Sequence, residues 1–462
     1  MPPLLTELPY HSDSALLFEA IADLPWAVFL DSGLHHPGQS RYDILSAQPY
    51  MRLVTRGALT EINEERIELS REDPFDLLRE RLATEPGSGG TLPFCGGAIG
   101  YFGYDLARRL QRLPARAADG ERIPEMAIGI YDWALVVDHL ERRTWLVGQG
   151  RDPDTDLKWD SLVRLFSAPV RERPRLRFRM TSPIISSLTH RAYAQAFEQI
   201  KRYIFDGDCY QVNLAQRFSA STTGDPWLAY QALRVLNPAP FAAYLSTPYA
   251  HVLCASPERF LRAEGGQVET KPIKGTRPRA GHARLDAELA QALRASEKDR
   301  AENVMIVDLL RNDLSKNCRL GSVTVPRLFD VESFATVHHL VSTVRGELTP
   351  GRDALDLLRG CFPGGSITGA PKLRAMQIIE ELEPNRRGVY CGAIGYIGFD
   401  GNMDVNIAIR TLVISRGETR FWAGGGIVAD SRLEDEYQET FDKAAALLNL
   451  LQQAAATANR GL

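Results

Sequence analysis

The stretch Glu269-Thr-Lys-Pro-Ile-Lys-Gly-Thr-Arg-Pro-Arg279 places Lys274 between an isoleucine and a glycine, close to other cations. The residues Gln267 to Thr270 have the composition of a short β-strand, and the prolines and the glycine that follow interrupt regular structure. Lys274 is therefore predicted at the end of a strand. Three interpretations are open: an ordinary surface charge, part of a basic patch for nucleic acid, or a nucleophile whose free amine is favoured by neighbouring cations.

Composition narrows these interpretations. The chain has 462 residues, of which 44% are hydrophobic and 24% charged, and its formal net charge is −4. This length allows large cores in about three domains or fewer. The net charge gives no overall positive field, so we predict no nucleic-acid partner. The six cysteines are scattered without a Cys-x-x-Cys pair, which favours reduced core thiols over disulfides or a zinc site.

The chain carries no signal for export or membrane insertion. Its first ten residues lack a basic region that leads into an apolar segment, as a secretory signal would have. No apolar run reaches the roughly 20 residues that a membrane-spanning helix needs. We therefore expect a cytoplasmic globular protein.

Two regions are expected, 1–180 and 185–455, joined by a Pro- and Arg-rich linker at 167–183. The sequence Gly96-Gly-Ala-Ile-Gly-Tyr-Phe-Gly-Tyr-Asp105 closely matches Cys391-Gly-Ala-Ile-Gly-Tyr-Ile-Gly-Phe-Asp400. This internal similarity is consistent with two halves built on related sheets, although the repeated segment is too short for a solenoid. The run 128–138 is predicted as one strand. Thr189 is predicted to cap a helix whose apolar face is Tyr193, Phe197, Ile200 and Ile204.

The segment Pro272-Ile-Lys-Gly-Thr276 resembles the signature of the chorismate-utilising enzymes. Within that family it is closer to the aminodeoxychorismate synthases than to the anthranilate synthases, which usually carry alanine at the position of Lys274. The resemblance extends over nearly the whole chain. It implies an α+β fold of the anthranilate synthase component I type, with two interleaved α/β parts, sheets packed around a central core, and helices outside.

Carboxylates on two predicted helices are candidate metal ligands. In the helix expected over 297–314, Glu302 falls on an otherwise apolar face, where it is either near water at the helix edge or bound to a partner. In the helix expected over 433–452, Glu436 and Glu439 lie one turn apart, a spacing that suits a hard divalent cation. The resemblance implies that Glu302 and Glu439 bind magnesium, with Glu436 nearby, and that the ion binds the ring carboxylate of chorismate.

A second feature is a glycine-rich segment, 362–372, that leads into a helix expected at Leu373 to Leu382. Thr368 is the predicted N-cap of this helix. Free backbone amides at such a start attract carboxylates, although the segment could equally be a well-capped structural helix.

A third feature combines the glycines of 422–427 with an arginine. On a strand expected over 403–414, Arg410 shares a face with Ala408 and Leu412, and an arginine in such surroundings usually has a bound or paired anion. The resemblance implies that the enolpyruvyl carboxylate of chorismate is held by the following groups: Arg410, Tyr390 and the amides of Gly424, Gly425 and Gly426, with Gly275, Thr276, Thr368, Gly369 and Gln211 lining the same pocket.

Acid–base residues complete the expected site. The resemblance implies that Glu258, which follows a strand at 251–255, protonates the leaving hydroxyl. It also implies that His339 lies beside the reacting ring carbon, while His338 is structural. Gln211 occupies the position where isochorismate-forming relatives use a lysine to activate water. A neutral glutamine cannot act as that base, which argues against water as the nucleophile.

The reaction implied is amination of chorismate at C4 to 4-amino-4-deoxychorismate, for p-aminobenzoate and folate synthesis, through a covalent intermediate on Lys274. No cysteine lies in the Gly-x-Cys-x-Gly context of a glutaminase nucleophile. Ammonia is therefore expected from solution or from a separate glutaminase subunit in a heterodimer. The alternatives are anthranilate synthase component I and a non-catalytic chorismate- or tryptophan-binding protein.

The resemblance also implies a tryptophan pocket in the N-terminal region. The matching residues are Ser32, Gln39, Ser40, Arg41, Tyr42, Pro240, Phe241 and Ala242. The chain lacks the Leu-Leu-Glu-Ser feedback motif of anthranilate synthases. We therefore expect a bound or bindable tryptophan with a structural role, the alternative being an empty pocket.

Overall fold

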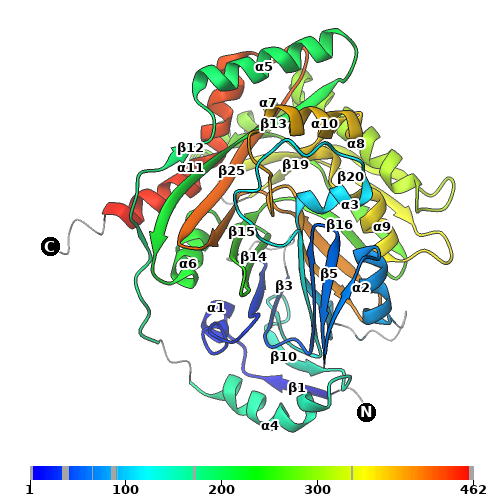
Figure 1. The fold of residues 1–462 in the computed structure, drawn as a ribbon, viewed down its shortest axis with the longest axis vertical. Coiled ribbons are helices and arrows are strands. Elements are labelled where there is room, and N and C mark those ends of the chain that lie inside the picture. The colour runs from blue at the N-terminus through cyan, green and yellow to red at the C-terminus, as the bar shows by residue number, and fades with distance from the viewer. Residues whose placement is uncertain are drawn as a thin grey trace.

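The computed structural model describes residues 4–33, 41–64, 66–84, 90, 92–169, 173–334 and 337–456. Two large antiparallel sheets form its centre, and helices surround them (Figure 1). This is the α+β architecture that the resemblance implied. None of the helices in the described ranges is both long and apolar enough to cross a membrane.

The first sheet has 13 strands in the described residues. Its order is β1 (Leu4–Leu8), β10 (Arg143–Gly148), β9 (Trp133–Asp138), β3 (Tyr42–Ser46), β2 (Val28–Asp31), β14 (Phe241–Ser246), β15 (His251–Ser256), β24 (Thr411–Ser415), β25 (Glu418–Ile427), β13 (Gln211–Thr223) and β11 (Arg179–Met180), with β12 (Ile185–Ser186) and β21 (Gly369–Ala370) also paired to β13.

In the same described ranges the second sheet has 12 strands. Its order is β18 (Ile273–Pro278), β20 (Val337–Glu347), β17 (Gln267–Thr270), β16 (Arg259–Glu264), β23 (Met403–Ile407), β22 (Ala393–Gly398), β7 (Gly97–Phe102), β8 (Met126–Tyr131), β4 (Met51–Arg56), β5 (Leu59–Asn63) and β6 (Ile67–Ser70), with β19 (Thr324–Ser333) paired to β20.

The helices are α1 (Ser14–Phe18), α2 (Pro74–Leu82), α3 (Ala107–Leu110), α4 (Pro153–Ser167), α5 (His190–Phe205), α6 (Pro226–Leu236), α7 (Ala283–Ala295), α8 (Glu297–Ser315), α9 (Ala354–Cys361), α10 (Lys372–Leu382) and α11 (Leu433–Ala456), with 3₁₀ turns η1 (Tyr104–Leu106) and η2 (Gly365–Ile367). The predicted helices at 190–204, 297–314 and 433–452 are confirmed as α5, α8 and α11. Thr189 caps α5 as predicted, by accepting a hydrogen bond from the backbone N–H of Ala192.

The two sheets share a buried core between their inner faces. Ile99 and Tyr101 of β7 lie in one cluster with Val136 of β9 in the other sheet. Ala98 and Phe102, which alternate with them along β7, belong to a different cluster. Because successive side chains of a strand point to opposite faces, β7 is buried on both sides.

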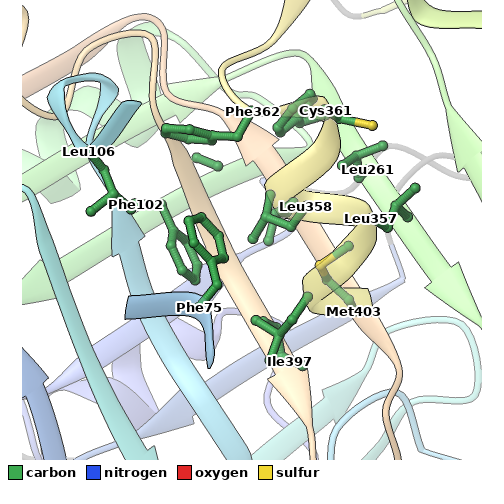
Figure 2. Close-up of a cluster of buried hydrophobic side chains, with 14 of the residues drawn as sticks. Phe75, Phe102, Leu106, Leu261, Leu357, Leu358, Cys361, Phe362, Ile397 and Met403 are labelled. Carbon is green, nitrogen blue, oxygen red and sulfur yellow. The ribbon is translucent and has the colours of Figure 1, made fainter. Parts of the chain in front are cut away.

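Figure 2 shows the apolar cluster on the outer face of the second sheet, where α2 and α9 pack. Phe75 of α2 stacks on Phe102 of β7, with ring centroids 5.5 Å apart. Leu357 and Leu358 are fully buried on α9. Burial of α9 fixes Phe362, the residue from which the glycine-rich segment 362–372 begins.

The two similar segments, 96–105 and 391–400, contain two strands that pair with each other. β7 and β22 lie side by side in the second sheet, and Gly100 pairs with Gly395. Both sheets contain strands from either side of residue 180, so the two parts of the chain are interleaved. The assignment of separate roles to regions 1–180 and 185–455 stays a prediction. Residues 173–178 of the expected linker have no regular structure.

Two predicted strands are wrong in the same way. The run 128–138 contains β8 and β9, which lie in different sheets on either side of Asp132. The run 403–414 contains β23 and β24, again in different sheets, with Arg410 at the bend between them. The run 128–138 is apolar almost throughout, and in the second run apolar residues, 407–409 and 412–414, lie on both sides of Arg410. Alternation of side chains therefore could not reveal where the chain changes sheets. Arg410 therefore does not share a strand face with Ala408 and Leu412.

Candidate active site

Lys274 lies inside a strand, not at the end of one as predicted. It pairs with Leu340 in the β18–β20 ladder, and the register shifts before Thr276 pairs with His339. Gly275 at this bulge has a φ of +73°, a conformation that glycine adopts without strain. A Cβ there would come within 2.8 Å of the Asp299 carboxyl carbon, so the bulge requires glycine on both grounds.

The Lys274 amine points into the interior and faces acidic groups. Its Nζ lies 3.4 Å from the backbone oxygen of Ser366. Burial lowers the pKa of Lys274, while the carboxylates of Glu302 and Glu258 act in the opposite direction without cancelling the effect. The free amine is thus more accessible than for an exposed lysine.

Glu258 is buried at the bend that follows β15, the strand predicted at 251–255. The Ser366 hydroxyl donates a hydrogen bond of 2.9 Å to its Oε1. Burial raises the pKa of Glu258, although the nearby charge of Lys274 lowers it in part. The environments of Lys274 and Glu258 thus shift both groups toward their neutral forms, an amine beside a carboxylic acid.

His339 and Thr276 face each other across the bulge. Their side chains are joined by a contact of 2.9 Å between Thr276 Oγ1 and His339 Nδ1. Burial lowers the pKa of His339 to about 4, and the positive charge of Arg410 adds to this effect. The imidazole is therefore neutral at physiological pH. His338 points elsewhere, with Nε2 3.0 Å from Asp286 Oδ1.

Arg410 occupies the bend between β23 and β24, with a φ of +49°. Its guanidinium donates a 3.1 Å hydrogen bond to the side-chain oxygen of Asn237, and no ion pair to a carboxylate is found for it within the described residues. Burial lowers the pKa of Arg410. A buried cation without a carboxylate partner is a strong candidate to bind an anionic ligand.

Tyr390 lies beside a buried network that fixes the segment around it. Its ring stacks on Trp422 with a centroid distance of 6.0 Å. The fully buried Arg387 forms an ion pair with Glu383 and donates to the backbone oxygens of Ile367 and Asn213. Arg387 thereby ties the end of α10, the turn η2 and strand β13 together.

The three glycines 424–426 lie inside β25 and not in a loop after a strand. Gly425 faces α11: a Cβ on it would lie 3.0 Å from Glu436 Oε2 and 3.3 Å from Glu439 Oε1. Gly426 faces Gln211, with 2.9 Å from its virtual Cβ to Gln211 Nε2. The glycines leave the space in front of these side chains open.

Gln211 is 1% exposed, and neither atom of its side-chain amide has a hydrogen-bond partner among the described residues. A buried amide of this kind is costly unless a ligand or water satisfies it. Gly369 of the glycine-rich segment pairs with Val212, the next residue of β13. The polar amide therefore lies where β13, β21 and β25 meet.

The prediction for Thr368 as a helix N-cap is wrong. The helix α10 begins at Lys372 with Pro371 at the N-cap, and no side chain caps it. The Thr368 hydroxyl instead donates to the backbone oxygen of Gly364 at 2.9 Å, which closes the turn η2. The local sequence has the features of a helix cap, but in the structure the Thr368 hydroxyl forms its hydrogen bond within the turn η2 and not at the start of α10.

Glu302, Glu436 and Glu439 face one another from α8 and α11. Burial raises the pKa of Glu302 and of Glu436, and the charge of Glu439 contributes to both shifts. Burial also acts to raise the pKa of Glu439, but the charge and hydrogen bond of Lys443 outweigh it and leave that pKa lowered. Mutual repulsion of this kind marks oxygen ligands that a cation would stabilise.

These carboxylates fit a magnesium ion that keeps most of its ligands as water. Within the described residues no group of three or more histidine, cysteine, aspartate or glutamate side chains that could hold a metal ion is found. Mg²⁺ is often bound by one or two carboxylates with waters and a substrate oxygen, and does not need such a group. The donor set thus suits magnesium better than a cation that requires a complete protein cage.

The comparisons with known proteins agree with this geometry. The family model described as "chorismate binding enzyme" matches residues 35–449. The chain belongs to this family. The resemblance noted in the sequence is thereby confirmed at the level of the family.

Relatives of this chorismate-binding enzyme extend along its full length. It is 48% identical over 457 residues to "Aminodeoxychorismate synthase component 1" of Klebsiella aerogenes, with 98% of this chain and 100% of the relative covered. It is 39% identical to "Anthranilate synthase component 1" of Thermus thermophilus, with 93% of each covered. The crystal structure of anthranilate synthase component I from Streptococcus pneumoniae TIGR4 matches with a TM-score of 0.79 at 33% identity, covering 89% of this chain and 92% of that one.

The residues expected to hold tryptophan lie at one end of the adjacent strands β3, β2 and β14 in the first sheet of this chorismate-binding enzyme. Gln39 and Ser40 lie outside the described residues. Ser32 donates from its backbone and hydroxyl to Asp43 Oδ1 at 2.7 and 2.6 Å. Ala242 pairs with Asp31 in the β14–β2 ladder, so Phe241 and Pro240, which precede Ala242, lie beside Ser32.

Arg41 and Tyr42 complete this group of residues at the strand ends. The Arg41 guanidinium lies 4.7 Å over the Tyr42 ring and forms an ion pair of 2.7 Å with Asp138. The sequence-predicted residues that are described, namely Ser32, Arg41, Tyr42, Pro240, Phe241 and Ala242, therefore gather in one neighbourhood of this chorismate-binding enzyme. Their binding of tryptophan stays a prediction.

Two side chains of the site were not predicted as site residues from the sequence. Ser366 contacts both Lys274 and Glu258. Lys443 forms an ion pair of 2.5 Å with Glu439 and donates to the backbone oxygen of Gly424. Position i+4 after Glu439 is a signal that could have identified Lys443. No local pattern marks Ser366, because its partners are 92 and 108 residues away in the chain.

Proposed function

We propose that this protein is component I of an aminodeoxychorismate synthase, an aminating transferase that acts on chorismate. The observation that carries the proposal is the pair of Lys274 and Glu258, whose pKa values are displaced toward a free amine and a carboxylic acid. A nucleophile and a proton donor side by side suit displacement of a hydroxyl group. The names of the relatives at 46–48% identity support the same activity.

The first step forms a covalent bond to the enzyme. The Lys274 amine attacks ring carbon C2 of chorismate, the two ring double bonds shift, and the bond from C4 to its hydroxyl breaks. Glu258 gives its proton to that hydroxyl, which leaves as water. The extra proton on the lysine nitrogen then passes to the Glu258 carboxylate, so Glu258 is an acid again.

The second step reverses this displacement with ammonia. Ammonia attacks C4, the double bonds shift back, and the bond between C2 and the lysine nitrogen breaks. Lys274 leaves as an amine by recovering a proton from Glu258, which in turn takes the surplus proton of the new ammonium group. The sum is replacement of the C4 hydroxyl by an amino group, with one water released.

Other groups hold the ring in place for both steps. Arg410 supplies the positive charge for the enolpyruvyl carboxylate, with Tyr390 and the amides around Gly425 at the same end. Gln211 offers its unpartnered amide to a polar substrate group. His339, being neutral, offers a ring nitrogen to the substrate without adding charge. Fixed orientation of the ring lowers the entropic cost of each displacement.

Magnesium is part of this proposal. Glu302 and Glu439 would hold the ion, with Glu436 nearby. The bound ion would supply a fixed positive charge for the ring carboxylate of chorismate. Lys298 and Lys443, which neutralise these glutamates in part, keep the acidic cluster compatible with the approach of an anionic substrate.

The magnesium assignment predicts a coupled loss of binding. Glu439→Gln should weaken Mg²⁺ and chorismate binding together by about tenfold or more, because one charged ligand is lost. Glu434→Gln is the control, since Glu434 lies on the same helix with its side chain 73% exposed. Isothermal titration of chorismate with and without Mg²⁺ measures both effects. Unchanged Mg²⁺-dependent binding in Glu439→Gln would rule the assignment out.

The activity itself is tested by product analysis. The protein is incubated with chorismate, Mg²⁺ and an ammonium salt, and the product is identified by mass and by retention against standards. Aminodeoxychorismate supports the proposal. If anthranilate is the product, the protein has the activity named for the Thermus thermophilus relative and not the proposed one. Absence of turnover would favour a non-catalytic binding protein.

We infer that the residues around Ser32 and Phe241 bind tryptophan. The support is the proximity of these residues and the aromatic surface of Tyr42 beside the Arg41 guanidinium. Equilibrium dialysis with labelled tryptophan should give saturable binding, and labelled leucine serves as the control for an apolar amino acid without an indole. A linear, non-saturable uptake of tryptophan would count against the pocket.

A further inference from the structure

The 3₁₀ turn η2 carries one side chain into the space between the two reacting groups. Ser366 is buried, and its hydroxyl donates to Glu258 Oε1 at 2.9 Å. Its backbone oxygen lies 3.4 Å from Lys274 Nζ. The same residue therefore contacts both the amine and the carboxyl group.

The turn that holds Ser366 is fixed on both sides. Arg387, itself fully buried, donates to the backbone oxygen of Ile367 at 2.9 Å, and the Thr368 hydroxyl donates to that of Gly364 at the same distance. The Leu309 side chain packs so closely on Gly365 that a Cβ there would be only 2.6 Å away. Ser366 thus has little freedom to move away from its two partners.

The hydroxyl also decides which oxygen of Glu258 can carry a proton. An oxygen that accepts the Ser366 O–H is occupied as an acceptor, so the acidic proton of the neutral carboxyl lies on Oε2. Without the hydroxyl, either oxygen could carry the proton and the carboxyl group could rotate. A proton donor must be held within hydrogen-bond reach of the group it protonates.

The geometry points to Ser366 as a positioning residue that directs the Glu258 proton onto Oε2 and holds the Lys274 amine beside it. This inference rests on the proposed function, because it gives Glu258 and Lys274 the roles of acid and nucleophile. Ser366 itself does not take part in bond making. Its effect is exerted through the two groups that it contacts.

The test compares variants at position 366 in the full chain with chorismate, Mg²⁺ and ammonium. Ser366→Ala should lower kcat about tenfold to a hundredfold, the range expected when a catalytic group is displaced, with little change in KM for chorismate. Ser366→Thr keeps the hydroxyl and should restore most of the rate. Ser46→Ala is the matched control, because Ser46 is also fully buried and donates to a backbone oxygen, that of Trp133, away from the site.

The pH profile separates positioning from simple loss of structure. The charged and hydrogen-bonding groups that face Glu258 are Lys274, Lys443, Ser366 and the backbone N–H of Ile273. A donor to the ionised carboxylate lowers its pKa, so removal of the hydroxyl should raise that pKa. Because Glu258 acts as an acid while protonated, the alkaline limb of kcat should move to higher pH in Ser366→Ala and return in Ser366→Thr.

Several outcomes would overturn the inference: a rate for Ser366→Ala within about twofold of the parent, equal losses in the Ala and Thr variants, or an unmoved alkaline limb. If Ser366→Ala does not fold, Ser366→Cys keeps the shape with a weak donor and should fall between the parent and the expected Ala value; a full rate would contradict the inference. Should the parent produce anthranilate, the proposed function fails, yet the same ratios still test Ser366, because that reaction also removes the C4 hydroxyl.

Discussion

Lys274→Ala is expected to lower aminodeoxychorismate formation by roughly a hundredfold or more, which is the contribution of a positioned catalytic group at the lower end of its range. The amine is the only group proposed to attack C2, and ammonia alone would have to displace the hydroxyl in one harder step. Folding should be retained, since burial disfavours the charge that is removed. Turnover with ammonium salts, measured beside the melting temperature, checks both statements.

The neighbouring Lys271 provides the control for this experiment. Lys271 forms an ion pair of 2.7 Å with Glu332 and lies three residues from Lys274 on the same segment. Lys271→Ala should keep most of its activity, apart from small effects on stability. A Lys274→Ala protein that turned over at the parent rate would remove the nucleophile from the mechanism. A small residual rate is compatible with direct attack by ammonia.

Formation of product is expected with ammonium salts and almost absent with glutamine when the chain is alone. A glutaminase of the acyl-transfer type needs an activated nucleophile, and a reactive cysteine needs a lowered pKa. Burial instead raises the pKa of all six thiols, to about 11 for Cys254 and Cys318. Product quantified with each nitrogen donor in turn gives the answer.

Addition of a separate glutaminase subunit should restore the use of glutamine. The relatives named component 1 imply that a second component exists for those proteins. The matched control is the same partner with its nucleophilic cysteine changed to serine, which should dock but supply no ammonia. Robust glutamine-dependent turnover by this chain alone, free of contaminating glutaminase, would contradict the prediction that a separate subunit supplies the ammonia.

Local sequence was sufficient for four of the helices and for the strands β15 and β17. Thr189, with an apolar residue about every fourth position after it, predicted α5, because a cap and a 3.6-residue period depend on neighbours within a few residues. The strand β17 and the long helices α8 and α11 were predicted for the same reason. The five-residue segment around Lys274 indicated the family, which the match over residues 35–449 confirmed.

The changes of sheet at Asp132 and Arg410 could not be predicted from alternation. Asp132 alone separates β8 from β9, whereas the three residues Ala408 to Arg410 separate β23 from β24. Where residues on both sides of a change of sheet are apolar at successive positions, the sequence contains no alternation that would show where one strand ends and the next begins. The position of Arg410 beside that change of sheet, where no carboxylate among the described residues pairs with its guanidinium, follows from how the two sheets pack.

By itself the sequence determined the family, four of the helices and the identity of the chemical groups, because these depend on residue types and short spacings. Tertiary structure alone decided how those groups act. Lys274 comes from β18, Glu258 from the end of β15, Ser366 from η2, and Glu439 from α11. Burial and the charges of distant residues set the pKa of each group, and both quantities exist only once the two sheets and their helices are packed together.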